Sequence, residues 1–258
     1  ADFKTYDELF DAFKKQMKYF IDVKIQGSNI IEKIFADCMP APFLSILTND
    51  CIAKGKDYNA GGARYNTKYL QGVGIGTITD CLAAVKYNVY DKKNFTMDEL
   101  MAALDDNFIG HERILNLVKN HSPKYGNDDE YADEIMKQVF EYYQGEVTGR
   151  PNMLGGMYRV NMLPTTCHVY FGEVMMASAN GRLAHVPVSE GISPEKGADV
   201  NGPTAVIKSC AKMDHLMTGG TLLNQKFTPS VVAGEEGLNQ MASLIRSYFN
   251  MDGHHIQF

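Results

Sequence analysis

The sequence contains no long basic run, no extended apolar segment and no paired-cysteine motif, and each absence narrows the possible functions. The 25 basic and 31 acidic residues give a net charge of −6, which disfavours binding to nucleic acid or to an anionic membrane surface. No apolar stretch approaches the roughly 20 residues that a helix needs to span a bilayer. We therefore expect neither a nucleic-acid nor a membrane partner.

The cysteines are odd in number and are never spaced as C-x-x-C. A disulfide framework needs paired cysteines, and a zinc site needs clustered ligands at short spacings. Reduced thiols are typical of cytoplasmic proteins, in which buried cysteines behave as small hydrophobic side chains. We therefore predict a cytoplasmic chain whose five thiols are all free: Cys38, Cys51, Cys81, Cys167 and Cys210.

The length of 258 residues and the hydrophobic content of 45% allow a sizeable core. No internal repeat, low-complexity stretch or clear linker divides the chain. We expect a single α/β segment over residues 1–258, in which 1–149 are mainly helical and 150–258 form strands alternating with helices.

Capping signals and apolar spacing predict the helices of the first part. Thr5 with Glu8, and Thr96 with Glu99, form capping-box patterns, whereas Gly55 is a helix-ending residue. The expected helices cover about 5–21, 28–35, 45–54, 77–90, 96 onward and 128–146.

After Gly149 the pattern changes to short strand-like runs separated by helices. Strands are expected at 163–171 and 221–227, with a helix beginning near Pro203 and another over 238–248. Residues 253–258 read as an extended segment with no cap or turn after it, so we expect more chain beyond this point in the parent protein. This order predicts a parallel or mixed α/β layer.

Glycines 72, 74 and 76 precede an expected helix, where backbone N–H groups can bind a phosphate. The spacing G-x-G-x-G differs from the dinucleotide-binding pattern, residues 68–71 make a poor strand, and no lysine completes a Walker A loop. We favour a tight packing turn, with nucleotide binding as the weaker alternative.

Three other patterns have ordinary structural explanations. In a strand, the neighbours in Cys167-His168 and in His254-His255 point to opposite faces, so neither pair can serve one site. Asp128, Asp129 and Asp133 fit the acidic first turn of a helix better than a cation site.

Thr165 and Thr166 follow Pro164 at the predicted start of a strand. Ligand-binding residues collect at strand ends in α/β layers, and a hydroxyl can both donate and accept hydrogen bonds. From the local pattern alone, an ordinary strand entry is the favoured interpretation.

Several separated motifs occur in a fixed order along almost the whole chain: Gly61–Asn66, Tyr125–Asp129 with Asp133, Asn180–Arg182, Pro187–Pro194, Asn201–Ala205 and Leu223–Phe227. In this order they resemble the glycyl radical enzymes, the pyruvate formate-lyase superfamily. Residues 163–168, 192–199 and 204–214 are most similar to the members of that superfamily that dehydrate trans-4-hydroxy-L-proline.

The resemblance implies a ten-stranded α/β barrel, with this chain supplying much of its second half. It implies removal of water from trans-4-hydroxy-L-proline to give pyrroline-5-carboxylate, by means of a glycyl radical, a thiyl cysteine and a carboxylate base. It also implies that Thr165, with Thr166 beside it, lines the substrate pocket and positions the substrate.

The partners implied by the resemblance are an amino-acid substrate, a radical-SAM activating enzyme with a [4Fe–4S] cluster, and a second copy in a homodimer. We expect no metal or organic cofactor to be bound to this chain itself.

The sequence departs from the family pattern in two places. It contains no G-C-x-E loop, so the thiyl cysteine and the base glutamate are absent, and no R-V-x-G-Y loop with the radical glycine. We therefore expect a barrel segment without the glycyl radical domain, with no catalytic residue of its own and inactive alone. Two alternatives stay open: a non-catalytic truncated or split chain that binds a complementing partner, and an eliminase for another substrate such as a 1,2-diol.

Overall fold

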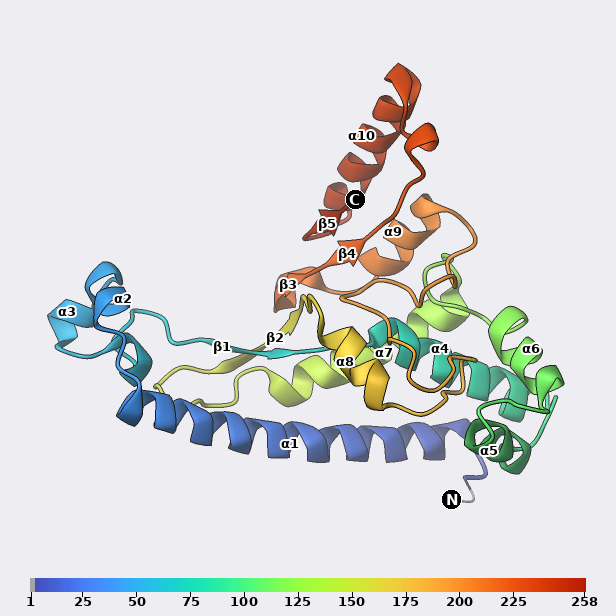
Figure 1. Cartoon of the computed structure of the whole chain (residues 1–258), viewed down its shortest axis with the longest axis horizontal. Helices are drawn as coiled ribbons and strands as arrows, with labels where there is room; N and C mark the ends of the chain where they lie inside the picture. The colour runs from blue at the N-terminus through green and yellow to red at the C-terminus, as the bar shows by residue number, and fades with distance from the viewer. Residues whose placement is uncertain (1–2) are drawn as a thin grey trace. The chain divides into compact units, whose positions relative to one another are not determined.

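The computed structural model describes residues 3–258, and its contacts separate into two compact units (Figure 1). Unit 1 contains the chain up to Phe10 together with residues 71–141 and 161–258. Unit 2 contains residues 11–70 and 142–160. Each unit is therefore assembled from segments that lie far apart in the sequence, and no single linker divides the chain.

The first helix, α1, runs without interruption from Tyr6 to Cys38, where separate helices over 5–21 and 28–35 were expected. The break expected near Ser28 is absent because contacts hold the helix directly after it. The side chain of Asn29 accepts a hydrogen bond from the Tyr158 hydroxyl at 2.9 Å, and Glu32 accepts one from the Met153 N–H at 3.1 Å. A glycine in a helix costs only about 1 kcal/mol relative to alanine, so these contacts outweigh the local signal.

Two short helices, α2 (Pro42–Leu47) and α3 (Cys51–Lys54), replace the single helix expected over 45–54. The interruption falls at Asp50, whose φ of 78° is left-handed and cannot continue a helix. Gly55 then caps α3 with a φ of 58°, as predicted. A short 3₁₀ turn, η1 (Tyr58–Ala60), follows.

Strands β1 (Lys68–Gln71), β2 (Tyr158–Met162) and β3 (Thr218–Thr221) form one sheet in the order β1-β2-β3. The N–H of Lys68 donates to Met157 O at 3.1 Å, and the N–H of Gly72 donates to Asn161 O at 2.8 Å. Donor and acceptor both advance by four residues, so β1 and β2 run parallel.

The strand expected over 163–171 is wrong. The strand lies earlier, at β2, and Cys167–Val174 forms a helix, α8. A short apolar run cannot be assigned to strand or helix by periodicity alone. The deciding contact is tertiary, because a Cβ on Gly172 would come within 2.4 Å of Val186 O, so α8 packs closely against that backbone.

The helices between residues 75 and 147 follow the expected pattern with one omission. Residues 75–91 form α4 (Ile75–Val85) and the π-helix η2 (Lys86–Asp91), and the capping box of Thr96 and Glu99 opens α5 (Met97–Asp105) as predicted. The helix α6 (Glu112–Asn120) was not anticipated. The helix expected over 128–146 is α7 (Glu130–Val147). Buried residues of α4, α5 and α6 pack together as one apolar core: Ala84, Val85, Leu100, Ala103, Ile114 and Val118.

The last part of unit 1 also agrees with the expected alternation. Pro203 opens α9 (Pro203–Ala211), and α10 spans Gly234–Asn250. The run expected as a strand over 221–227 is divided between β3 and β4 (Leu223–Asn224), with η3 (His215–Met217) before them and η4 (Pro229–Val231) after them. The terminal extended segment is confirmed as β5 (Ile256–Gln257), which pairs in parallel with β4.

Among the described residues, no helix is both long enough and apolar enough to cross a bilayer.

Two helical glycines give a matched test of the packing. A Cβ on Gly76 would lie 2.7 Å from Ser193 O and 3.0 Å from Glu195 N, both backbone atoms, whereas a Cβ on Gly145 would meet nothing within 4 Å. We expect Gly76→Ala to lower the free energy of unfolding by about 1–3 kcal/mol through overpacking. We expect Gly145→Ala to raise it by about 0.5–1 kcal/mol, because alanine favours the helix. Urea unfolding followed by circular dichroism measures both, and equal effects would contradict the packing described.

Candidate functional site

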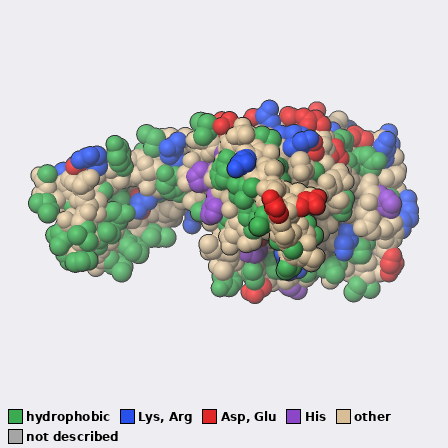
Figure 2. All heavy atoms as spheres, turned by 90° about the horizontal axis from the view of Figure 1, so that it is seen from above, with side chains coloured by type: hydrophobic (Ala, Val, Ile, Leu, Met, Phe, Trp, Pro, Cys, Tyr) green, Lys and Arg blue, Asp and Glu red, His purple; other side chains and the backbone are tan. Residues whose placement is uncertain are grey.

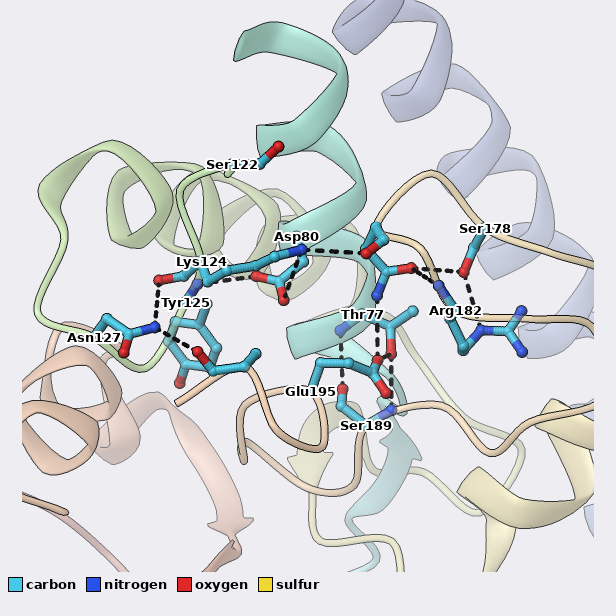
Figure 3. A network of polar contacts seen from close by, with 12 residues as sticks. Thr77, Asp80, Ser122, Lys124, Tyr125, Asn127, Ser178, Arg182, Ser189 and Glu195 are labelled. Atoms are coloured by element: carbon cyan, nitrogen blue, oxygen red, sulfur yellow. Dashed lines mark hydrogen bonds and ion pairs between the residues drawn. The ribbon is translucent and has the colours of Figure 1, made fainter. Parts of the chain in front are cut away.

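A buried aspartate, Asp80 on α4, is the centre of a polar network that joins several of the sequence motifs (Figure 3). Its Oδ1 accepts a hydrogen bond from the backbone N–H of Tyr125 at 2.9 Å. Its Oδ2 has no hydrogen-bond partner in the described chain, although Lys124 Nζ lies 3.9 Å away. Burial raises the pKa of Asp80 to about 7, since Lys124 and the Tyr125 N–H compensate only in part for the lost solvation.

Tyr125 connects this centre to two other segments. Its hydroxyl lies 2.9 Å from Ile192 O, to which it donates, and 3.1 Å from Cys210 Sγ on α9. The side chain is fully buried, and burial holds its pKa well above the usual range. The tyrosine therefore stays neutral and acts as a rigid connection between the motif at 125–129, the motif at 187–194 and α9.

Asn127 holds the loop that precedes α9. Its Oδ1 accepts from the backbone N–H groups of Val200 and Asn201, at 2.8 and 3.1 Å, and its Nδ2 donates to Ala198 O at 2.8 Å. The amide thus replaces the backbone partners that an irregular loop lacks.

The three aspartates of this motif have different structural roles. Asp129 accepts from the Tyr131 N–H at 3.0 Å at the start of α7, in agreement with the capping interpretation. Asp128 pairs with Lys208 at 3.0 Å, and buried Asp133 pairs with Lys212 at 2.7 Å. These two therefore attach α7 to α9. No group of three or more side chains suited to a metal ion occurs within residues 3–258.

The glycine turn at 72–76 is covered by the segment that contains Ser189 and Glu195. The Thr77 N–H donates to Ser189 Oγ at 3.0 Å, and the Ser189 N–H donates to Thr77 Oγ1 at 2.8 Å. The Thr77 hydroxyl also donates to the Glu195 carboxylate, whose pKa is raised by burial. This N–H at the start of α4 is therefore already bonded within the protein, which supports the packing turn over a phosphate site.

Arg182 is a buried arginine whose guanidinium is used internally. It donates to the carbonyl oxygens of Met176 at 2.5 Å, Val186 at 2.6 Å and Leu183 at 3.1 Å, while its Nε donates to Ser178 Oγ at 3.0 Å. The planar guanidinium donates to several carbonyl oxygens at once and so holds the loop after α8 in a folded conformation around the Arg182 side chain. Its donors are occupied within the protein, so it is a structural residue.

Thr165 and Thr166 lie between the carboxyl end of β2 and the first turn of α8, and not at the start of a strand as expected. Both are exposed, and neither hydroxyl makes a hydrogen bond to the described residues. Because β1 and β2 are parallel, the turn at Gly72 lies at the same edge of the sheet. Exposed hydroxyls at the carboxyl ends of parallel strands are well placed to contact a ligand.

The argument that separated Cys167 from His168 also needs correction, because both residues are on helix α8 and not on a strand. Cys167 is exposed, and His168 Nε2 lies 3.9 Å from Glu190 Oε2. All five cysteines are free, as predicted. Burial raises the pKa of Cys81 to about 11 and that of Cys210 to about 12, so these two are protonated thiols at neutral pH.

Sequence reasoning missed the residues that organise the site. Asp80 lies inside an apolar helix, and no local pattern marks it. Lys124 directly precedes the motif at 125–129 and Glu195 directly follows the motif at 187–194, and these positions were the available signals. The network depends on approaches between segments up to 118 residues apart, such as Thr77 and Glu195.

The order of the sequence motifs, the parallel strands β1 and β2 and the buried polar network together indicate the class of protein. Residues 1–172 match the pyruvate formate lyase-like family model, and residues 188–258 match the glycine radical model. The chain belongs to the pyruvate formate lyase-like family.

The chain is 70% identical to trans-4-hydroxy-L-proline dehydratase of Clostridioides difficile over 257 residues, which are 100% of this chain and 33% of that protein. It is 36% identical to (2S)-3-sulfopropanediol dehydratase of Klebsiella oxytoca, over 99% of this chain and 32% of the relative. The chain thus spans about a third of the length of the curated relatives it matches.

Solved structures show the same fold. The hydroxyproline dehydratase of Clostridioides difficile, solved with trans-4-hydroxy-L-proline bound, matches with a TM-score of 0.98 and 70% identity. The B12-independent glycerol dehydratase of Clostridium butyricum matches with a TM-score of 0.95 and 41% identity. Each match covers 100% of this chain and 33% of the solved chain.

The match over 188–258 corrects one expectation. The motifs from Pro187 onward were assigned to the barrel domain alone, but this stretch matches the glycine radical model. Part of the glycyl radical region is therefore present, although the R-V-x-G-Y loop does not occur in the 258 residues. The motifs alone did not show where the pyruvate formate lyase-like region ends and the glycine radical region begins. In the structure the two regions are in contact, since the Tyr125 hydroxyl donates to Ile192 O across that boundary.

The raised pKa of Asp80 predicts a specific dependence of stability on pH. An unfolded aspartate has a pKa of about 3.9, so between about pH 4 and pH 7 the folded protein binds a proton that the unfolded chain has released. Stability contributed by this group is present at pH 4 and is lost as pH rises to 7. We expect Asp80→Asn, which keeps the oxygen that accepts from Tyr125, to remove this loss.

The measurement is urea unfolding of both proteins at pH 4, 5.5 and 7. The free energy of unfolding of Asp80→Asn should increase relative to the unsubstituted protein as pH rises. Exposed Asp105 on α5 supplies the matched control, since Asp105→Asn should leave the pH profile unchanged. Parallel profiles for Asp80→Asn and the unsubstituted protein would refute a protonated Asp80.

Proposed function

We propose that this chain is a working part of a glycyl radical dehydratase that removes water from trans-4-hydroxy-L-proline to give pyrroline-5-carboxylate. The proposal rests on the difference in sequence identity between this chain and two of its relatives. The chain is 70% identical to a hydroxyproline dehydratase over its whole length but 36% identical to a sulfopropanediol dehydratase. The motifs of the superfamily alone would not distinguish these enzymes, so the excess identity supports the hydroxyproline substrate.

Thr165 and Thr166 are the residues that we assign to substrate positioning. Their hydroxyls are exposed and free of internal hydrogen bonds, in contrast to the fully bonded Thr77. A hydroxyl can donate to a carboxylate and accept from an ammonium or hydroxyl group. Hydroxyproline carries groups of all these kinds, so two adjacent hydroxyls can fix its orientation relative to the reacting carbon.

The buried network supplies rigidity and not chemistry. Tyr125 and Arg182 are bonded within the protein, and Asp80 is fully buried and accepts a hydrogen bond from the Tyr125 N–H. Together they fix α4, the loop after α8 and the segment at Ile192 in place, and a closed, water-poor cavity requires such rigidity. We propose that these segments belong to the second half of a ten-stranded α/β barrel.

The glycyl radical, when present, would generate the thiyl radical that abstracts hydrogen from the substrate. The 258 residues contain neither a G-C-x-E loop nor an R-V-x-G-Y loop, so we propose that the chain is inactive alone and acts within a longer cytoplasmic polypeptide. The partners that we propose are a radical-SAM activating enzyme with a [4Fe–4S] cluster, and a second copy of the enzyme in a homodimer.

The first test is the intact mass of the polypeptide made in its native cells. The proposal predicts a mass well above that of residues 1–258, and turnover of hydroxyproline after anaerobic activation. A mass equal to that of residues 1–258 would refute it and would favour a chain completed by a separate partner. Turnover of a 1,2-diol without turnover of hydroxyproline would instead indicate another eliminase.

The role of Thr165 gives a second test on the activated enzyme. We expect Thr165→Ala to lower kcat/KM for hydroxyproline by about 10–100-fold through loss of one or two hydrogen bonds to the substrate, and Thr165→Ser to restore most of it. Thr228→Ala is the control, because Thr228 is exposed and makes no capping hydrogen bond. Steady-state kinetics that are the same for Thr165→Ala and Thr228→Ala would exclude a positioning role.

A further inference from the structure

Helix α1 carries an apolar stripe that its own unit does not cover. The α1 stripe consists of Phe20, Val23, Gly27, Ile30 and Ile34, at alternating spacings of three and four residues. Its large members are exposed by 64% at Phe20, 49% at Val23, 62% at Ile30 and 52% at Ile34. This spacing places all five residues on one face of the helix, which is the pattern of a helix–helix contact.

The face of α1 that unit 2 uses is a different one. Ile21 and Ile25 are buried, and Asn29 and Glu32 make the hydrogen bonds to Tyr158 and Met153. The stripe therefore does not contribute to the core of unit 2. An amphipathic helix normally presents charged or polar side chains on its second face, so a regular apolar row there needs a partner.

Gly27 adds an independent indication of helix packing. It lies in the middle of the stripe and in the middle of a 33-residue helix, where a glycine is unfavourable. A Cβ at this position would meet nothing within 4 Å, so no contact within residues 3–258 requires a glycine. A residue without a side chain allows the backbone of a second helix to approach closely at this point.

The charges beside the α1 stripe indicate the charge that a partner helix would carry. Lys24 and Lys33 flank the stripe on its two sides, and both are exposed. Lys33 pairs with Asp37 at 2.9 Å, whereas Lys24 makes no ion pair in the described part of the chain. A second copy of α1 would bring lysines against lysines, but a helix with acidic flanks would pair with them.

Unit 2 as a whole leaves apolar surface exposed. Figure 2 shows hydrophobic side chains gathered over α2 and α3, at the left of the view. Helix α2 has no buried residue, and its exposed side chains include Phe43 at 73% and Leu47 at 68%. A folded monomer rarely exposes contiguous apolar surface of this kind without an interaction partner.

We propose that the α1 stripe is the docking surface for an amphipathic helix with acidic flanks, which comes from the part of the enzyme polypeptide outside residues 1–258. This inference rests on the proposed function, since it assigns the partner to the same enzyme. The relatives are about three times as long as this chain, because it covers 33% of the hydroxyproline dehydratase. The remaining sequence is therefore long enough to provide such a helix on the same molecule.

The test is site-specific thiol labelling of the polypeptide as the cell encodes it, without radical activation. Ile30→Cys places a thiol in the stripe, and Lys15→Cys places one at an exposed position of α1 that precedes the stripe. We expect the maleimide to react at least tenfold more slowly at position 30 than at position 15, as quantified by peptide mass spectrometry. Equal rates would overturn the proposal. Protection that disappears on dilution would also overturn it, since the partner would then be a second copy.

A second pair of variants tests the acidic flanks. Lys24→Glu should lower the melting temperature of the same polypeptide by several degrees, whereas Lys15→Glu should leave it unchanged. Equal melting temperatures for the two variants would contradict an acidic partner.

These results are independent of catalysis. Hydroxyproline turnover by an enzyme whose position 30 reacts as fast as position 15 would overturn the docking helix and leave the proposed function standing. Protection of position 30 in an enzyme that does not turn over hydroxyproline would support the docking helix and overturn the proposed function.

Discussion

The hydrogen bond from the Tyr125 N–H to buried Asp80 is the contact on which the rest of unit 1 depends. It fixes the motif at 125–129 against α4, and the hydroxyl of the same tyrosine then reaches Ile192 and Cys210. Tyr125 therefore connects α4 to two parts of the glycine radical region, which are the segment at Ile192 and helix α9. A buried carboxyl with one unbonded oxygen is expensive, and here the raised pKa of Asp80 lowers that cost by allowing the neutral acid.

The polar residues of the site divide into two groups by what their hydrogen bonds do. Asp80, Asn127, Arg182 and Glu195 make hydrogen bonds within the protein and hold its segments in place. Thr165 and Thr166 are the opposite case, because their hydroxyls are exposed and unbonded. Fixed segments together with free hydroxyls are the combination that the proposed substrate positioning requires.

The two units differ in how they satisfy their apolar side chains. Unit 1 buries a continuous core through α4, α5 and α6. Unit 2 leaves the second face of α1 exposed, and α2 has no buried residue. The exposed apolar surface of unit 2 is consistent with the proposal that the chain acts within a larger enzyme.

Local signals predicted a large part of the fold. The Thr96–Glu99 capping box, the helix end at Gly55 and the helix opened by Pro203 follow from the chemistry of a few neighbouring residues. The errors arose where distant contacts decide: α1 continues through Ser28 because Tyr158 and Met153 hold it, and α8 is a helix where an apolar run suggested a strand.

The sequence by itself determined the helix caps, the α/β class and the order of motifs that resembles the glycyl radical enzymes, because each is encoded in residues close together in the chain. Only the tertiary structure decided that Asp80 is buried beside Lys124, that Ser189 occupies the glycine turn, and that the threonines lie at a strand's carboxyl end. The physical reason is that burial and hydrogen-bond partners depend on segments more than 100 residues apart, which no local pattern records.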